Sequence, residues 1–264
     1  MKKEVLITVK TYPLPTSRYD ESVCTAGFTR DKKWIRIYPI KFRNLPYSSQ
    51  YKKYDWIEID VEKNLSDFRA ESFRPLKLDI DITISGHINT DSNWYERKQI
   101  VLNNVEENMQ SLIKDAKDKS KYKSLSVFKP KEIIDFHATS TSREWGVKKQ
   151  NILAQGNLFD RNGELIKKLP YKFFFKFIDI KNKECNMMIE DWEIGELFWK
   201  CLSNRGNERK AIDDVKNKYF NDLAKTKDLY LYLGTTREHH LTARNPFLII
   251  GLFYPKKENP NLFT

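Results

Sequence analysis

Alternating apolar and polar residues mark several short strands in the first third of the chain. Residues 4–10 (EVLITVK) alternate and are rich in β-branched side chains, a pattern that favours an extended strand. The segments VCTAGF (23–28) and WIRIYPI (34–40) flank the polar turn TRDKK, which predicts a hairpin. Two further alternating segments, WIEIDVEK and LDIDITISGHI, complete a set of five short strands with irregular links. This profile is typical of a small β-barrel, so we expect residues 1–90 to form a barrel-like domain.

From Trp94 onward the spacing of apolar residues predicts both helices and strands. Apolar residues recur at helical spacing over 94–121, which predicts one helix there. Residues 139–163 are polar with turn signals such as RNGE, and we predict a linker or mobile loop. Further strands are predicted for YKFFFKFIDIK, DLYLYLGT and PFLIIGLFYP, and helices for DWEIGELFWKCL and NERKAIDDVKNKYFNDLAK. We therefore expect an α+β protein, with the barrel followed by a mixed α+β domain at 91–264.

The charge balance points to a polyanionic partner. The chain has 47 Lys and Arg against 36 Asp and Glu, a formal net charge of +11. Such a balance favours DNA, RNA or an anionic membrane surface, although a Lys-rich solvated surface is the simpler explanation. No apolar run approaches the roughly 20 residues of a membrane span, so we expect no membrane partner. The sequence does not indicate an oligomeric state.

The numbers of cysteines and glycines bear on the cellular compartment and on the class of fold. Three widely spaced cysteines argue against a disulfide framework and for a reducing compartment, so we expect a cytoplasmic protein. The N-terminal MKKEVLITVKTY lacks a cleavage site and reads as a strand, not as a signal peptide. With nine glycines and no Gly-rich phosphate loop, the chain does not fit a dinucleotide-binding or P-loop fold.

Basic and aromatic residues are interleaved in the N-terminal segment. From Lys10 to Lys53 there are ten Lys or Arg against three acids. Cations neutralise phosphates and aromatic rings stack on unpaired bases, so we predict a nucleic-acid-binding surface with a slight preference for single strands. Alternatively, the rings pack under a loop or a second domain, or contact a protein partner. The predicted contacts, including two arginines of a C-terminal loop, are Lys10, Tyr12, Arg18, Arg30, Lys32, Lys33, Trp34, Arg36, Tyr38, Lys41, Arg43, Arg237 and Arg244.

One strand carries the centre of this surface. On an extended strand Trp34, Arg36 and Tyr38 point to one face, while Ile35 and Ile37 point to the other. If the isoleucines fill the barrel, the Trp-Arg-Tyr row faces outward.

The run CTAGFTRDKKWIRIYPI resembles the C-x-A-G…G-x-W-I-R-P hairpin of bacterial dual-OB-type domains, small β-barrels associated with nucleic-acid metabolism. The resemblance covers residues 21–43, with Lys33 in place of the usual Gly and two residues between Arg36 and Pro39. It implies an OB-like barrel and a nucleic-acid setting such as phage defence or repair, and it implies no catalysis. The framework positions that it implies are Cys24, Ala26, Gly27, Trp34 and Arg36.

The loop GTTREHHLTARNP is a second candidate site. It places His239 and His240 between Arg237 and Arg244, so it could bind phosphate, or one His could act as a general base. Adjacent histidines on a strand point to opposite faces, and no Cys or Asp stands at ligand spacing, so we predict no metal site. A solvated hairpin loop is the alternative.

A nuclease is the enzymatic alternative. Asp179-x-Lys181 lies in a predicted strand, and Asp160 precedes it by nineteen residues. Two carboxylates can hold Mg²⁺ while the lysine steadies the attacking water. Mg²⁺ is a cofactor in this alternative alone, and no cofactor is otherwise expected. The sequence favours a binding protein over an enzyme, and it does not decide whether any catalysis occurs.

Overall fold

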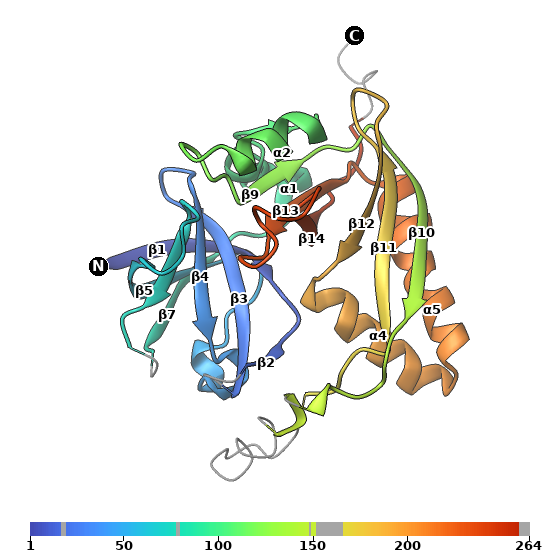
Figure 1. The fold of residues 1–264 in the computed structure, drawn as a ribbon, viewed down its shortest axis with the longest axis horizontal. Helices are drawn as coiled ribbons and strands as arrows, with labels where there is room; N and C mark the ends of the chain where they lie inside the picture. Colours follow the sequence, from blue (N-terminus) through green and yellow to red (C-terminus); the bar gives the residue numbers. More distant parts are fainter. Residues whose placement is uncertain (17–19, 78–79, 148, 152–165, 259–264) are drawn as a thin grey trace. The chain divides into compact units, whose positions relative to one another are not determined.

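The structure, a computed structural model, describes residues 1–16, 20–77, 80–147, 149–151 and 166–258 (Figure 1). The chain divides into two compact units. The first contains Met1–Ile88 and Thr139–Lys172, and the second contains Asn89–Ala138 and Phe173–Thr264. Each unit has its own β-sheet. The described part of the predicted linker at 139–163 belongs to the first unit, and residues 152–163 lie outside the described residues.

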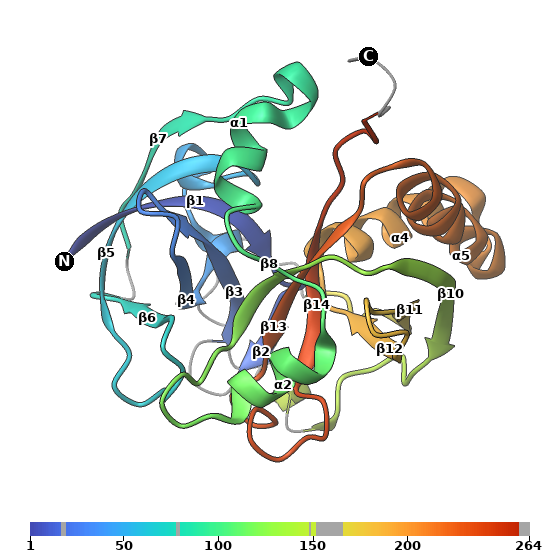
Figure 2. The same ribbon diagram turned by 90° about the horizontal axis from the view of Figure 1, so that it is seen from above.

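The first unit is built on a closed five-strand barrel, which confirms the predicted α+β class with an N-terminal barrel. Neighbouring strands follow the order β1-β3-β4-β6-β5, and β5 pairs back to β1 (Figures 1 and 2). The β4–β6 pair is parallel, and the other four pairs of the ring are antiparallel. This order is consistent with an OB-like small barrel. Its strands are β1 (Lys2–Lys10), β3 (Asp20–Thr29), β4 (Trp34–Ile40), β5 (Asp55–Lys63) and β6 (Ser72–Pro75).

Short elements extend the barrel. The strand β2 (Leu14–Thr16) pairs with β3, and β7 (Ile82–His87) pairs with β5. Two 3-10 helices, η1 (Phe42–Asn44) and η2 (Tyr47–Ser49), follow β4. Ile35 and Ile37, which were expected to fill the barrel, are buried. Other β-branched side chains of the barrel strands are buried as well: Val5, Ile7, Val9, Ile57, Ile59 and Val61.

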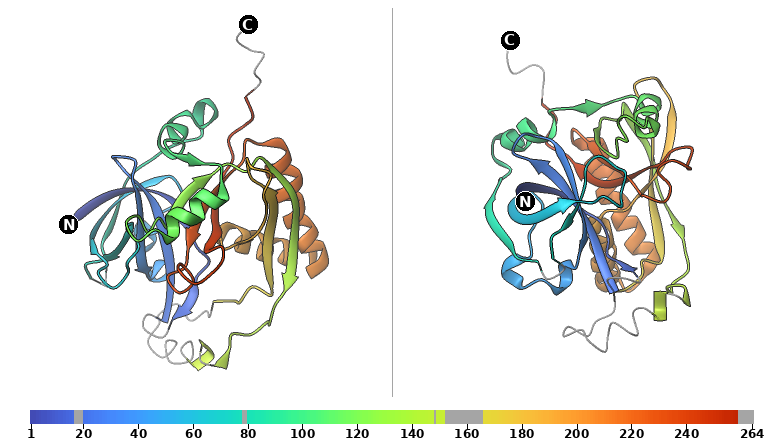
Figure 3. Two further views of the ribbon diagram at one scale, coloured as in Figure 1. Left: turned by 45° about the horizontal axis from the view of Figure 1, so that its top comes forward. Right: turned by 60° about the vertical axis from the view of Figure 1, so that its left-hand side comes forward.

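The second unit contains a mixed sheet in the order β10-β11-β12-β14-β13-β9-β8 (Figures 2 and 3). The hairpin of β13 and β14, which is last in sequence, therefore lies inside the sheet. Its strands are β8 (Val105–Glu106), β9 (Leu125–Phe128), β10 (Glu132–Ser140), β11 (Tyr171–Ile178), β12 (Glu184–Ile189), β13 (Tyr230–Thr235) and β14 (Phe247–Phe253).

Aromatic contacts join this sheet to helix α4 (Trp192–Arg205) and to the π-helix η3 (Asn217–Ala224), which continues helix α5 (Glu208–Lys216). Phe198 of α4 lies 5.9 Å from Phe173 of β11, and Tyr219 of η3 lies 5.9 Å from Phe136 of β10, between ring centroids. All four rings are buried, so they form an aromatic core under these helices.

The helix predicted over 94–121 is two helices, α1 (Asp91–Val101) and α2 (Met109–Lys117), with β8 between them. The break has a local cause, because the side chain of Asn108 accepts hydrogen bonds from Gln110 N (3.0 Å) and Ser111 N (3.2 Å) and so begins a new helix. No helix in the described ranges is long and apolar enough to cross a membrane.

Candidate nucleic-acid interface

The Trp-Arg-Tyr row of β4 is not a continuous exposed face. Trp34 and Tyr38 are half-buried, whereas Arg36 is 2% exposed. The Trp34 ring packs against Phe28 of β3 at 4.1 Å between centroids, and the Tyr38 hydroxyl accepts a hydrogen bond from Ser22 Oγ. The expectation that all three side chains face outward is therefore wrong for Arg36. Strand alternation gives the direction of a side chain but does not show what covers it.

Arg36 lies in a cluster of charged residues near the β4–β6 pair. Its backbone N–H donates to the carbonyl of Glu71 at 2.7 Å. Burial lowers the pKa of the Arg36 guanidinium, the charge of Arg69 lowers it further, and Cys24, Glu71 and Asp67 oppose that change. In this position the Arg36 guanidinium is covered by other residues and is not offered to a phosphate at the surface.

Asp67 and Arg69 form a buried ion pair in the loop between β5 and β6. The Asp67 carboxylate accepts from Arg69 Nη2 at 2.6 Å and from Ser72 Oγ at 2.7 Å. Burial alone would raise the pKa of Asp67, but the hydrogen bonds and charge of Arg69, together with Ser72, outweigh burial and lower that pKa to about 2. The pair therefore holds the loop against the barrel with Asp67 ionised.

Protonation of Asp67 is expected to destabilise the barrel at low pH. Because its folded pKa of about 2 lies below the ordinary aspartate value of 3.8, its contribution is present above roughly pH 4 and is lost as the pH falls toward 2. Asp67→Asn should lower the free energy of unfolding at pH 7 by about 1–2 kcal/mol and flatten its pH dependence below pH 4. Urea unfolding at several pH values measures both effects. The exposed pair of Glu62 with Arg74 supplies the control Glu62→Gln, and equal effects of the two variants would contradict the prediction.

The turn between β3 and β4 carries cations that are largely paired. Arg30 forms an ion pair with Glu4 and lies 3.6 Å from the centroid of the Trp56 ring. Lys33 forms an exposed ion pair with Asp31 at 2.8 Å. The predicted contact Lys32 is exposed, with a backbone φ of 59° that fits its place in the turn. Since carboxylates neutralise two of the three cations, this turn attracts a polyanion less than its sequence suggests.

The segment after β4 keeps its positive charge. Residues 41–53 (KFRNLPYSSQYKK), here called the basic segment, contain four Lys or Arg and no acid. Lys52 is exposed, and Lys41, Arg43 and Lys53 are half-buried. The ring of Tyr47, in η2, is 90% exposed. An exposed ring among cations is the combination that single-strand binding uses, in which bases stack and phosphates are neutralised.

Two buried rings attach the basic segment to the barrel. The Phe42 and Tyr51 rings lie edge to face at 4.9 Å, and the Tyr51 hydroxyl lies 2.5 Å from Thr25 Oγ1 of β3. Burial raises the pKa of Tyr51. The predicted contact Lys10 places its ammonium 4.1 Å from the centre of the Phe42 ring and donates to the Tyr51 carbonyl. These rings therefore anchor the segment, while Tyr47 stays at the surface.

The other predicted contacts are dispersed. The Tyr12 hydroxyl donates to the Lys167 carbonyl at 2.8 Å, within the first unit. Arg237 and Arg244 are exposed in the loop between β13 and β14. Arg18 lies outside the described residues. The structure thus supports the basic segment more than the β4 row as a continuous surface.

The two histidines of the C-terminal loop have different environments. His239 is exposed, whereas His240 is fully buried. His240 Nε2 lies 2.7 Å from the Ala116 carbonyl of α2, and its Nδ1 lies 2.7 Å from Thr235 Oγ1. A carbonyl can only accept, so Nε2 carries a proton and His240 fastens the loop to α2. In this position it has no exposed nitrogen with which to act as a general base.

The residues of the nuclease alternative do not form a described site. β11 ends at Ile178, so Asp179 and Lys181 lie in the following turn and not on the strand. Asp179 is buried, and its carboxylate accepts from the backbone N–H groups of Lys181, Lys183 and Met109. Asp160 lies outside the described residues. In the ranges that the structure describes, no group of three His, Cys, Asp or Glu side chains could hold a metal ion.

Two family models together match nearly the whole chain. Residues 1–103 match a domain of unknown function, DUF8758, and residues 105–264 match a second one, DUF8757. Because the second match spans more than half of the sequence, the chain belongs to the DUF8757 family. The border between the matches falls between the end of α1 at Val101 and the start of β8 at Val105. No curated protein matches the chain.

Proposed function

We propose that the chain binds nucleic acid through the basic segment, with Tyr47 stacking on an unpaired base and the neighbouring cations neutralising phosphates. The single observation that supports this most directly is the 90% exposed Tyr47 ring in a segment with four basic residues and no acid. An OB-like barrel adds support by analogy, because other barrels of this kind bind oligonucleotides. Stacking requires unpaired bases, so single strands are favoured.

Loss of the Tyr47 ring is expected to weaken binding of single-stranded nucleic acid. Stacking contributes about 1–3 kcal/mol per base, so Tyr47→Ala should raise Kd at least about fivefold. Lys52→Glu should weaken binding of all sequences and lower the slope of log K against log salt by about one. Fluorescence anisotropy with labelled single-stranded DNA, duplex DNA and single-stranded RNA at several salt concentrations measures both effects.

Two exposed residues outside the basic segment provide matched controls. Leu65 is 93% exposed, so Leu65→Ala removes a surface side chain as prominent as Tyr47. Lys77 is exposed beyond β6, so Lys77→Glu reverses the same charge as Lys52→Glu. If wild type binds and all four variants bind equally well, the interface lies elsewhere. If wild type does not bind even at low salt, the proposed function is wrong, and capture of a protein partner by the Tyr47 surface becomes the better explanation.

A further inference from the structure

Three pairs of lysines gather at one end of the sheet in the second unit. Lys129 and Lys131 follow β9, Lys225 and Lys227 precede β13, and Lys256 and Lys257 follow β14. The strand ends are neighbours, because Tyr230 pairs with Phe253 and Leu231 pairs with Phe128. A β-bridge between Lys227 and Lys256 continues the pairing beyond the strands. Segments separated by about a hundred residues in sequence thus bring their cations together.

These lysines surround a groove of about 660 Å³, here called the lysine groove. Five of them line it, namely Lys129, Lys131, Lys225, Lys227 and Lys257, and the single acid in its described lining is Glu132. Apolar side chains also line the groove, among them Ile133, Leu229 and Phe220. The groove therefore combines a strongly positive edge with an apolar and aromatic surface.

Neutral oxygens hold three of the ammonium groups. Lys131 Nζ donates to Asn182 Oδ1 at 2.6 Å, Lys225 Nζ to Asn221 Oδ1 at 3.2 Å, and Lys257 Nζ to the Lys225 carbonyl at 2.8 Å. An amide or carbonyl oxygen positions an ammonium group without cancelling its charge. These three lysines therefore leave a concentrated positive charge in the groove.

The other two lysines of the groove have acidic partners. Lys129 forms an ion pair with Asp228. Lys227 lies 3.9 Å from Asp222, whose carboxylate is also 2.6 Å from Lys218. One carboxylate thus serves two ammonium groups, which adds to the uncompensated charge.

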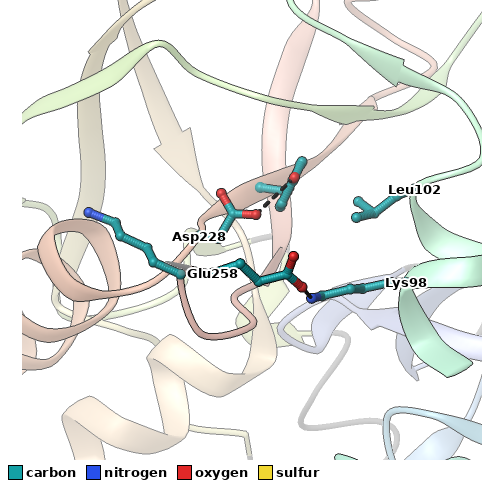
Figure 4. A pocket seen from close by; sticks show the side chains of 6 residues that line it. Lys98, Leu102, Asp228 and Glu258 are labelled. Atoms are coloured by element: carbon teal, nitrogen blue, oxygen red, sulfur yellow. Dashed lines mark hydrogen bonds and ion pairs between the residues drawn. The ribbon is translucent and has the colours of Figure 1, made fainter. Parts of the chain in front are cut away.

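A neighbouring cavity shares Lys257 with the lysine groove and contains a lysine that is paired with an acid. It has a volume of about 440 Å³ and is lined by Lys98, Lys257, Asp228 and Glu258, with Leu102 and Tyr230 (Figure 4). Here Lys98 and Glu258 meet at 2.5 Å, and the Tyr230 hydroxyl donates to Asp228 at 3.0 Å. Lys98 is thus paired with an acid in this cavity, whereas Lys131, Lys225 and Lys257 of the lysine groove contact neutral oxygens.

The backbone around the groove is held in unusual conformations. The groove residues Phe220 and Ala224 belong to the π-helix η3, a conformation that occurs frequently at functional sites. A left-handed turn over Ser92–Trp94 precedes the regular part of α1. Its Asn93 side chain accepts from Lys256 N at 2.7 Å and donates to the Lys256 carbonyl at 3.0 Å. These contacts fix the chain as it leaves β14 and so position Lys257.

We propose that the lysine groove binds a nucleotide unit, with phosphate oxygens on Lys131, Lys225 and Lys257 and the base against Phe220. The charge matches phosphate, which accepts several charge-assisted hydrogen bonds. The aromatic and apolar lining matches the face of a base. The same chemistry is presented by a nucleic-acid strand and by a mononucleotide such as ATP, so both are tested. This site is independent of the barrel's basic segment.

Protection from chemical acetylation tests the groove in the wild-type full chain. ATP or a single-stranded oligonucleotide should slow acetylation of Lys131, Lys225 and Lys257 at least about threefold, since bound phosphate shields these amines. Lys119 and Lys210, which are exposed and do not line the groove, should be acetylated at an unchanged rate. Protection by ATP assigns the site to a mononucleotide, and protection by the oligonucleotide alone assigns it to a strand. No selective protection by either probe would overturn the proposal.

Variants supply the second arm of the test. Lys131→Gln with Lys225→Gln should weaken binding of the protecting probe about tenfold or more, whereas Lys119→Gln with Lys210→Gln, which removes the same charge, should change it little. Equal losses in the two double variants would show a general charge effect and would overturn the proposal. Tyr47→Ala should leave protection of the groove lysines unchanged, which separates this site from the barrel interface.

Discussion

Replacing Gly27 by alanine is expected to disrupt the barrel. Gly27 lies in β3 between β1 and β4, paired with Ile7 and Ile35. A Cβ atom at Gly27 would lie 1.9 Å from the Leu6 carbonyl oxygen, far inside van der Waals contact. The obstacle is backbone, so no side-chain rotation relieves it, and β1 and β3 would have to separate. We expect a loss of more than about 3 kcal/mol in the free energy of unfolding of the barrel unit.

Thermal unfolding followed by circular dichroism measures this loss, expected as a fall of about 10 °C or more in Tm. Gly86 in β7 provides the control, because a Cβ built there meets nothing within 4 Å. Gly86→Ala should be neutral or slightly stabilising, since alanine restricts the unfolded chain more than glycine does. If Gly27→Ala melted like Gly86→Ala, the close approach of β1 and β3 would not exist as described.

Removal of the Asp179 carboxylate is expected to have the second largest effect. Its Oδ1 accepts from the N–H groups of Lys181 and Lys183, both at 2.8 Å, and its Oδ2 accepts from Met109 N at 3.1 Å. The carboxylate thereby shapes the β11–β12 turn and ties it to the start of α2. Asp179→Ala leaves three backbone donors without this acceptor, and we expect a loss of about 3–5 kcal/mol in the free energy of unfolding.

A graded series tests this structural role against the nuclease alternative. Asp179→Asn keeps one acceptor oxygen and should lose less stability than Asp179→Ala, while Lys181→Ala, at an exposed position, should change stability by under about 0.5 kcal/mol. Urea unfolding of the three variants measures the series. A metal-dependent nuclease would show the opposite pattern, with cleavage lost in Asp179→Asn at unchanged stability.

The barrel could be predicted because its information is local. Alternation predicted β1, β4 and β5 as strands and Ile35 and Ile37 as the inner face of β4, and the polar turn TRDKK predicted the connection of β3 to β4. The resemblance implies Gly27 as a framework position. The structure gives a reason for glycine there, because the Leu6 carbonyl leaves no room for a Cβ atom. Strand pairs close in sequence leave a periodic pattern in the chain, and this pattern makes the hairpin of β3 and β4 predictable.

The candidate site was harder to predict, because exposure is a property of the folded chain. Among the interleaved aromatic residues that the structure describes, Phe28, Phe42, Tyr51 and Tyr54 are buried, while Tyr47 is exposed in a segment without acids. Composition does not separate a core ring from a stacking ring. The sequence does contain one local indication that Tyr47 is exposed. It lies between Pro46 and Ser48, and proline and serine favour turns at the surface.

The lysine groove could not be predicted from spacing along the chain. Its lysines lie in the segments KPK, KTK and KK at 129–131, 225–227 and 256–257, which have the composition of ordinary solvated charge. They meet because β13 lies between β14 and β9 in the sheet. A lysine pair that directly flanks each of three strands is a usable signal once that strand order is known.

The inner position of the β13–β14 hairpin has a consequence for synthesis of the protein. β8 and β9 lie at one edge of the sheet, and β10, β11 and β12 lie at the other. These two groups emerge from the ribosome first but cannot join until the strands between them have been made. The 64 residues that follow Ile189, up to Phe253, take about 3–13 s to translate at 5–20 residues per second. During that interval the apolar face of β11, with Phe173, Phe175 and Phe177, lacks its completed sheet, and exposed apolar surface of this kind makes an incomplete chain prone to aggregation.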